Sequence, residues 1–174
     1  KETELRAFEA LKQGGLPDDC FYQPPFDLSG GQKRRAAIAG VLAMKPEVLV
    51  LDEPTAGLDP GGRDEILDLV SSLRDENGMT VILVSHSMDD VAEYVDRIVV
   101  MDRGGVCFDD TPKEVFSHKE ELEGMGLRVP QITKIMQELI KLGVPADPST
   151  LTVDRAVKQL IPYFKSRGGD KNGY

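Results

Sequence analysis

Hydrophobic residues along the chain alternate between helical spacing and short continuous runs. Apolar positions at helical intervals predict helices over residues 1–13 and 29–44, and another that opens at Asp59-Pro60. Fully apolar runs predict strands over residues 48–51, 80–84 and 97–101. Such strands, alternating with helices, are typical of a parallel sheet covered on both faces. The pattern therefore predicts an α/β fold.

The pattern changes towards the C-terminus. A turn at Arg103-Gly104-Gly105 joins the third strand to residues 106–109, which predicts an antiparallel hairpin. From residue 111 to Phe164 there are three or four helical patterns and no strong strand. We therefore predict part of an α/β domain over residues 1–110, a helical extension over 111–165 and a disordered tail over 166–174.

Composition narrows the class of protein. The 174 residues are 40% hydrophobic and 29% charged, and the net charge of −9 argues against non-specific binding to nucleic acid. No apolar run is long enough to span a membrane. Cys20 and Cys107 lack metal-ligand spacing, which predicts free, partly buried thiols in a reducing compartment. These features indicate an acidic cytosolic protein.

The segment Ser29-Gly30-Gly31-Gln32 has two interpretations. It fits a capping box, a common structural motif in which the serine and the glutamine bond to each other's backbone. However, paired glycines weaken a helix and let another molecule approach the backbone closely. Residues 33–35 are all cationic, although positive charge in a first turn opposes the helix dipole. A phosphate over the N–H groups of the two glycines explains both features.

Asp52 and Glu53 directly follow the predicted strand 48–51. Carboxylates at the C-terminal end of a parallel strand lie where open α/β sheets bind ligands. Asp52 is predicted to hold Mg²⁺, directly or through its water shell. Glu53 is predicted to face the attacking water as general base or orienting group. Acidic residues also end strands without a function, but their combination with the glycine motif favours catalysis.

Two further residues are candidates for the same site. His86 follows the predicted strand 80–84, from where a side chain could reach a γ-phosphate, although a single histidine is more often structural. Asp59 precedes Pro60 and is well suited to cap a helix. Capping and a role at the nucleotide can coexist.

Together these residues resemble an ABC ATPase. Leu28–Gln32 matches the signature motif without departure, and Val48–Glu53 matches the Walker B strand with its catalytic glutamate. Ala56–Asp59 matches the D-loop, and His86 the switch histidine. The resemblance implies a P-loop NTPase-like fold of the ABC ATPase type, with ATP and Mg²⁺ as cofactors.

Other segments are similar to the energy-coupling factor (ECF) ATPases of cobalt, nickel and vitamin importers. These segments are Gln32–Arg35, Ala37–Met44, Gly57–Arg63 and Ser85–Ala92. Gly126–Pro130 and the helices after it resemble the C-terminal extension of that group, which helps two ATPase subunits stay together.

The resemblance also implies a mechanism and partners. Two ATPase subunits, identical or different, close head to tail around two ATP molecules and drive a membrane-embedded partner, which chooses the substrate. The protein would be peripheral, at the cytoplasmic face of the membrane, with no nucleic-acid partner. Ser29, Gly30 and Gly31 would contact the nucleotide held by the other subunit. Gln32 and Asp59 are also predicted to bind the cofactor. Asp52, Glu53 and His86 act within their own subunit.

The sequence lacks the P-loop pattern G-x-x-x-x-G-K-[ST], which cradles the phosphates in these enzymes. We therefore expect the chain to be the C-terminal part of a longer protein, whose other strands complete the sheet. By itself, the chain should hydrolyse ATP at no rate above background. An exposed sheet edge or face should result. Two alternatives remain: an ABC-fold ATPase acting on DNA or the ribosome, and a dimerisation or regulatory module built on residues 112–164.

Overall fold

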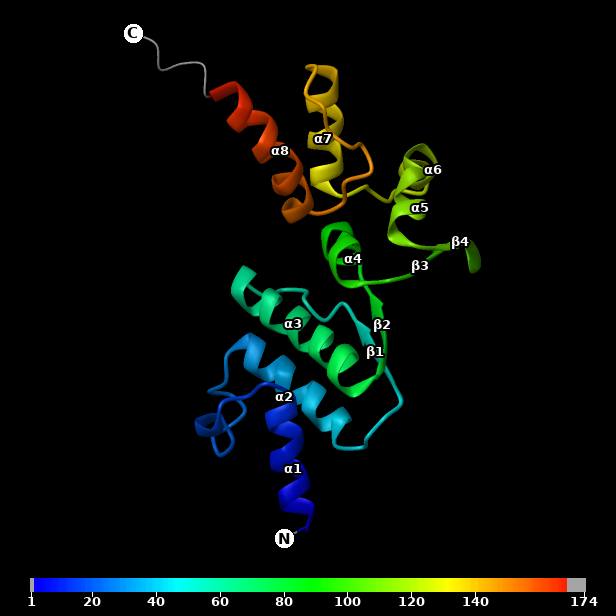
Figure 1. The fold of residues 1–174 in the computed structure, drawn as a ribbon. Coiled ribbons are helices and arrows are strands. Elements are labelled where there is room, and N and C mark those ends of the chain that lie inside the picture. Colours follow the sequence, from blue (N-terminus) through cyan, green and yellow to red (C-terminus); the bar gives the residue numbers. More distant parts are fainter. Residues whose placement is uncertain (1, 169–174) are drawn as a thin grey trace. The chain divides into compact units, whose positions relative to one another are not determined.

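The computed structural model of the chain describes residues 2–168. Contacts divide it into two compact units that meet between Ser85 and His86. The first unit contains α1 (Glu2–Gln13), the 3-10 turn η1 (Asp18–Cys20), α2 (Gly30–Leu42), β1 (Val48–Asp52), α3 (Pro60–Asn77) and β2 (Thr80–Val84) (Figure 1). The second contains α4 (Met88–Tyr94), β3 (Ile98–Asp102), β4 (Gly105–Asp110), α5 (Pro112–Ser117), α6 (Lys119–Gly124), α7 (Gln131–Lys141) and α8 (Val153–Gly168). None of the described helices is long and apolar enough to cross a membrane.

Helix α3 shows how local sequence sets the ends of a helix. The carboxylate of Asp59 accepts the backbone N–H of Gly62 at 3.2 Å, and Pro60 takes the first helical position. At the other end, Gly78 has a φ of 62°, a left-handed conformation that glycine adopts without strain. The predicted capping role of Asp59 is thus confirmed.

The core of the first unit lies between α2, α3 and β1. Its buried residues are Ile38, Leu42, Leu49, Ile66, Leu69 and Leu73. A second cluster joins α1, η1 and α2 and consists of Ala10, Leu16, Cys20, Leu28 and Ala39. Here the chain after α1 runs so close to α2 that a Cβ at Gly14 would lie 2.9 Å from the Cβ of Ala39. Only glycine allows this approach, which fixes α2 and the loop before it.

Strands β1 and β2 form a parallel pair, with Val48 opposite Thr80 and Asp52 opposite Val84. This confirms the predicted parallel pairing. Among the described residues, α2 and α3 pack only on the side that carries Leu49. The cover of both faces that the apolar runs predicted is therefore wrong, whereas the predicted exposed sheet face is confirmed. On the other side, Val50 keeps 59% of its surface exposed and Ile82 keeps 48%. We call this side, formed by Val48, Val50, Asp52, Thr80, Ile82 and Val84, the open face.

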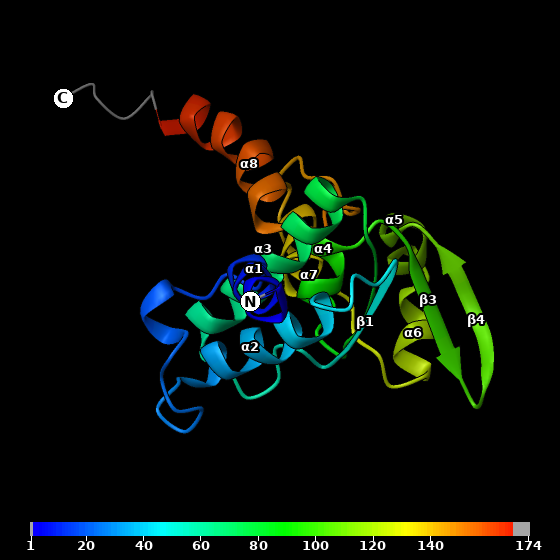
Figure 2. The same cartoon turned by 90° about the horizontal axis from the view of Figure 1, so that it is seen from below.

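In the second unit, β3 and β4 form the predicted antiparallel hairpin (Figure 2). Ile98 stands opposite Asp110, and the register shifts between Val100 and Met101. The run at 97–101 was expected to join the parallel sheet, but within residues 2–168 β3 pairs with β4 alone. Strand β3 belongs to the second unit, whose core buries Val100 and leaves Val99 and Met101 exposed.

The second unit has its own core, formed by α4, β3, α5, α6 and the segments around α7. Its buried residues are Val91, Val100, Val115, Phe116, Leu122, Val129 and Leu151. The described residues after the hairpin form four helices, as the helical patterns predicted. Figure 1 shows the last two, α7 and α8, side by side. Helix α4 therefore shares a hydrophobic core with the helical extension.

Two expected boundaries compare differently with the structure. The compact units separate at residue 85, whereas the ATPase part was expected to end at residue 110. A division into compact units does not show where an ATPase domain ends, so the boundary at residue 110 stays a prediction. The tail was expected to be disordered from residue 166, but α8 continues to Gly168. The rest of that tail, residues 169–174, lies outside the described residues.

Candidate functional site

The signature turn is built as a capping box. The Ser29 Oγ accepts the Gln32 backbone N–H at 3.2 Å, and the Gln32 Oε1 accepts the Ser29 backbone N–H at 2.8 Å. These two bonds satisfy donors that a helix end otherwise leaves unpaired. The structural interpretation of this motif is therefore confirmed. It does not compete with anion binding, because neither bond uses the N–H groups of Gly30 and Gly31.

The other end of the Gln32 side chain is also occupied. Its Nε2 donates to the Sγ of Cys20 at 3.3 Å. Cys20 is buried, and burial, reinforced by the negative charge of Asp19, raises the pKa of its thiol. Both cysteines are free as expected, but Cys107 is exposed rather than partly buried. Gln32 thus ties the signature turn to the core, and its contact with a ligand stays a prediction.

The three cations at 33–35 bond to protein groups. The Lys33 Nζ donates to the carbonyl oxygen of Phe26 at 3.3 Å, and the Arg34 Nη2 to that of Ala56 at 3.4 Å. Arg35 forms an ion pair with Glu65 of α3. The sequence predicted a bound anion for these charges, whereas the structure shows protein acceptors that lie 7, 22 and 30 residues away along the chain.

A hollow of about 360 Å³ lies beside the signature turn, between the start of α2 and the start of α3. It is lined by Ser29, Gly30, Gly31, Gly57, Leu58, Asp59, Gly61, Gly62 and Glu65. The structure therefore brings together four predicted residues: Ser29, Gly30, Gly31 and Asp59. Five of the nine lining residues are glycines, so at these positions no side chain separates the hollow from the backbone. Glu65 and the pair Gly61-Gly62 were not predicted, although the pair's place just after Asp59 was a usable signal.

Asp52 and Glu53 lie at the C-terminal end of β1, as predicted. Asp52 is exposed on the open face, opposite Val84 of β2. The Glu53 backbone N–H donates to the Val84 carbonyl oxygen at 2.9 Å, and Glu53 has a φ of 46°. Such a left-handed conformation is uncommon for a residue other than glycine and is often found at functional sites. The backbone turns sharply here and leads directly into the D-loop.

His86 is the first residue of the second unit and is exposed, two residues after β2. Helix α4 begins at Met88 with Ser87 as its cap, whose Oγ accepts the Asp90 N–H at 3.4 Å. The position of His86 after a strand end is confirmed. Its action on a γ-phosphate stays a prediction.

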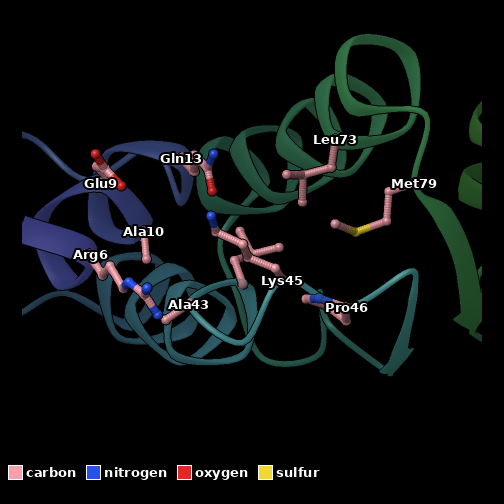
Figure 3. Close-up of a pocket in the computed structure, with 10 residues that line it drawn as sticks. Arg6, Glu9, Ala10, Gln13, Ala43, Lys45, Pro46, Leu73 and Met79 are labelled. Atoms are coloured by element: carbon pink, nitrogen blue, oxygen red, sulfur yellow. The ribbon is translucent and has the colours of Figure 1, made fainter. Parts of the chain in front are cut away.

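A second cavity, of about 260 Å³, lies among the ends of α1, α2 and α3. Figure 3 shows Arg6, Gln13 and Lys45 along it, with Leu73 and Met79 on its apolar side. It contains none of the residues predicted for catalysis or phosphate binding. The hollow beside the signature turn is therefore the candidate site.

The chain has many relatives among known proteins. A family profile described as "AAA domain, putative AbiEii toxin, Type IV TA system" matches residues 17–89, which include the signature turn, β1 and β2. The energy-coupling factor transporter ATP-binding protein EcfA2 of Caldanaerobacter subterraneus is 48% identical over 172 residues, which are 99% of this chain. The chain spans 59% of that relative's length.

Solved structures of ABC cassettes are similar to this chain in both sequence and fold. The structure of cbiO1 from Clostridium perfringens, described as part of the ABC transporter complex cbiONQ, is 46% identical with a TM-score of 0.62. The match covers 77% of this chain and 53% of that one. The ATP-binding cassette MJ0796, a dimer bound to ADP and Pi, is 34% identical with a TM-score of 0.53, over 62% of this chain and 46% of its own. The chain is therefore similar, over nearly all its residues, to the ATP-binding proteins of energy-coupling factor transporters, and its fold is that of part of an ABC ATPase domain.

Proposed function

We propose that this chain supplies the signature and catalytic-carboxylate part of an ATP-hydrolysing subunit in an ABC importer of the energy-coupling factor type. The hollow that Ser29, Gly30 and Gly31 form with Asp59 carries the proposal. Its glycine-rich wall and helix N-terminus suit a phosphate. The 48% identity to an energy-coupling factor ATP-binding protein supports the assignment to importers of a metal ion or vitamin.

The signature turn binds the γ-phosphate of an ATP held by a second ATPase subunit. The N–H groups of Gly30 and Gly31 point out of the first turn of α2, where no intrahelical acceptor exists. Because the Ser29 hydroxyl oxygen accepts the Gln32 N–H, its own hydrogen is left to donate to a phosphate oxygen. Gln32 keeps this geometry fixed, and Asp59 holds the facing turn of α3.

The catalytic carboxylate is Glu53, which accepts a proton from the attacking water of the ATP bound in its own subunit. His86, after the neighbouring strand, donates to the γ-phosphate of the same ATP. Asp52 fits Mg²⁺ because it offers an exposed carboxylate at a strand end, and Mg²⁺ prefers few carboxylates together with phosphate and water. Asp52 would hold the ion, which would supply positive charge against the phosphates of the nucleotide.

The partners are a second ATPase subunit, identical or different, and membrane-embedded subunits that select the substrate. The dimeric cassette and the transporter complex among the similar structures support this. The protein is then peripheral, at the cytoplasmic face of the membrane. Nucleic acid is not a partner, in keeping with the net charge of −9.

A matched pair of glycine substitutions tests the phosphate-binding role. A Cβ at Gly31 would lie 3.7 Å from the Cα of Gly62, an ordinary contact, and a Cβ at Gly40 of the same helix meets nothing within 4 Å. In the full gene product we expect Gly31→Ala to lower ATP turnover by ~10-fold or more, because the methyl group stands where the phosphate approaches the backbone. Gly40→Ala should leave turnover within about twofold of wild type, since it changes no such surface. Equal turnover in the two variants contradicts the proposal.

The helical extension mediates contact between two ATPase subunits. On α8, Val153, Val157, Ile161 and Phe164 recur at helical spacing, and each keeps 46–63% of its surface exposed. They form one apolar stripe, which we call the α8 stripe. Ala156, on another side of α8, is buried. An apolar stripe of this length on a helix surface is typical of a helix–helix interface.

Ile161→Asp should abolish dimerisation of the full gene product in the absence of ATP, measured by sedimentation velocity. The new charge lies in the middle of the α8 stripe and would lose its hydration on association. Ser166→Asp adds the same charge to an exposed position of the same helix, away from the stripe, and should leave the dimer intact. Equal dissociation by both variants, or by neither, contradicts the role of the stripe.

A further inference from the structure

Arg35 is a cation held almost out of solvent between α2 and α3. Its side chain is 11% exposed, and its Nη1 bonds to the Glu65 Oε2. Its Nε has no hydrogen-bond partner among the described residues. Burying a charge is costly unless it is paired and hydrogen-bonded. Because the Arg35 Nε lacks a hydrogen-bond partner, a hydrophobic side chain would fill this position at a lower cost in free energy.

Glu65 places its charge at the candidate phosphate site. It lines the hollow beside the signature turn, and its side chain is 56% exposed. A Cβ at Gly31 would lie only 3.8 Å from its Oε2. The carboxylate is therefore next to the backbone that an incoming phosphate would contact. Like charges at such short range repel each other.

No cation lines the hollow among the described residues, but two carboxylates do. Asp59 has a compensating partner in the N-terminus of α3, because its carboxylate accepts the Gly62 N–H at 3.2 Å. For Glu65, the compensating partner is the guanidinium of Arg35 behind it. Removal of Arg35 would leave a free negative charge in an anion-binding hollow.

We infer that Arg35 is a positioning residue of the nucleotide site: it holds the Glu65 carboxylate against α2 and offsets its charge, so that the hollow accepts a nucleoside triphosphate. The inference rests on the proposed function. It assigns Arg35 no contact with the ligand. Its effect passes through Glu65, and this makes a rescue experiment possible.

The experiment compares Arg35→Met, Glu65→Gln and the double variant in the full gene product. Methionine keeps most of the aliphatic volume of Arg35 without its charge. Arg35→Met should raise the Kd of the dimeric protein for a fluorescent ATP analogue and the KM for ATP by ~10-fold, and leave kcat within about threefold. High salt should reduce the effect, because Glu65 is partly exposed. Glu65→Gln alone removes the charge at nearly constant volume and is the reference for the double variant.

The double variant decides between electrostatics and packing. If Arg35 acts through the charge of Glu65, Arg35→Met with Glu65→Gln should match Glu65→Gln alone. This comparison holds even if Arg35→Met does not fold, because removing both members of an ion pair is far less disruptive than removing one. A double variant with ~10-fold weaker binding than Glu65→Gln overturns the inference, and so does wild-type affinity in folded Arg35→Met. If the wild-type protein does not bind the ATP analogue, both the proposed function and this inference are wrong.

Discussion

Glu53→Gln in the full gene product should abolish ATP turnover, with kcat at least ~100-fold below wild type and ATP binding retained. Glutamine has nearly the same shape but cannot accept a proton from the attacking water. The backbone of Glu53 is fixed by its N–H bond to the Val84 carbonyl at 2.9 Å, so the substitution should leave the fold intact. Steady-state phosphate release and equilibrium binding of ATP measure the two quantities separately.

Glu47→Gln is the matched control for this variant. Glu47 is exposed and precedes β1, at the end of the strand opposite to Glu53. It should retain wild-type turnover. Comparable loss in both variants, or none in Glu53→Gln, removes Glu53 from the chemistry. The 174-residue chain by itself should hydrolyse ATP at background rate, because it contains no G-x-x-x-x-G-K-[ST] loop to hold the phosphates.

Features set by neighbouring residues could be predicted from the sequence. Helix α3 begins after Asp59-Pro60 because a carboxylate cap and a proline both act within one turn. The capping box at Ser29 and Gln32 depends on two residues three apart, and it formed as expected. Asp52 and Glu53 occupy a strand end because the apolar run stops there. Local signals thus located Ser29, Gly30, Gly31 and Asp59 at the hollow, and Asp52 and Glu53 at a strand end outside it.

Features set by distant contacts could not be predicted in this way. The three cations at 33–35 suggested an anion, yet their hydrogen-bond acceptors are Phe26, Ala56 and Glu65. No sequence pattern near residue 35 indicates that a carboxylate of α3 will stand beside it. Likewise, the apolar run at 48–51 predicted a strand buried on both faces, since hydrophobicity does not say which segment supplies the cover.

Ile66→Ala should be the most destabilising single substitution considered for the first unit, lowering the free energy of unfolding by about 2–5 kcal/mol. Ile66 has no exposed surface and packs among α2, α3 and β1. Truncation leaves a cavity between the two helices that carry the signature turn and Asp59. Urea unfolding of the 174-residue chain, followed by circular dichroism, measures the change. A loss below about 1 kcal/mol contradicts this account of the core.

Ile82→Ala is the informative control, because the same side-chain atoms are removed from the open face. Ile82 is 48% exposed, so in the 174-residue chain the loss should be about 1 kcal/mol or less. In the full gene product, the same substitution should be several times more costly if further segments of the protein cover the open face. Ile66→Ala should cost the same in both contexts, since the core cluster to which Ile66 belongs consists of residues of the first unit. The pair therefore separates a core that the chain completes by itself from a face whose burial depends on the rest of the protein.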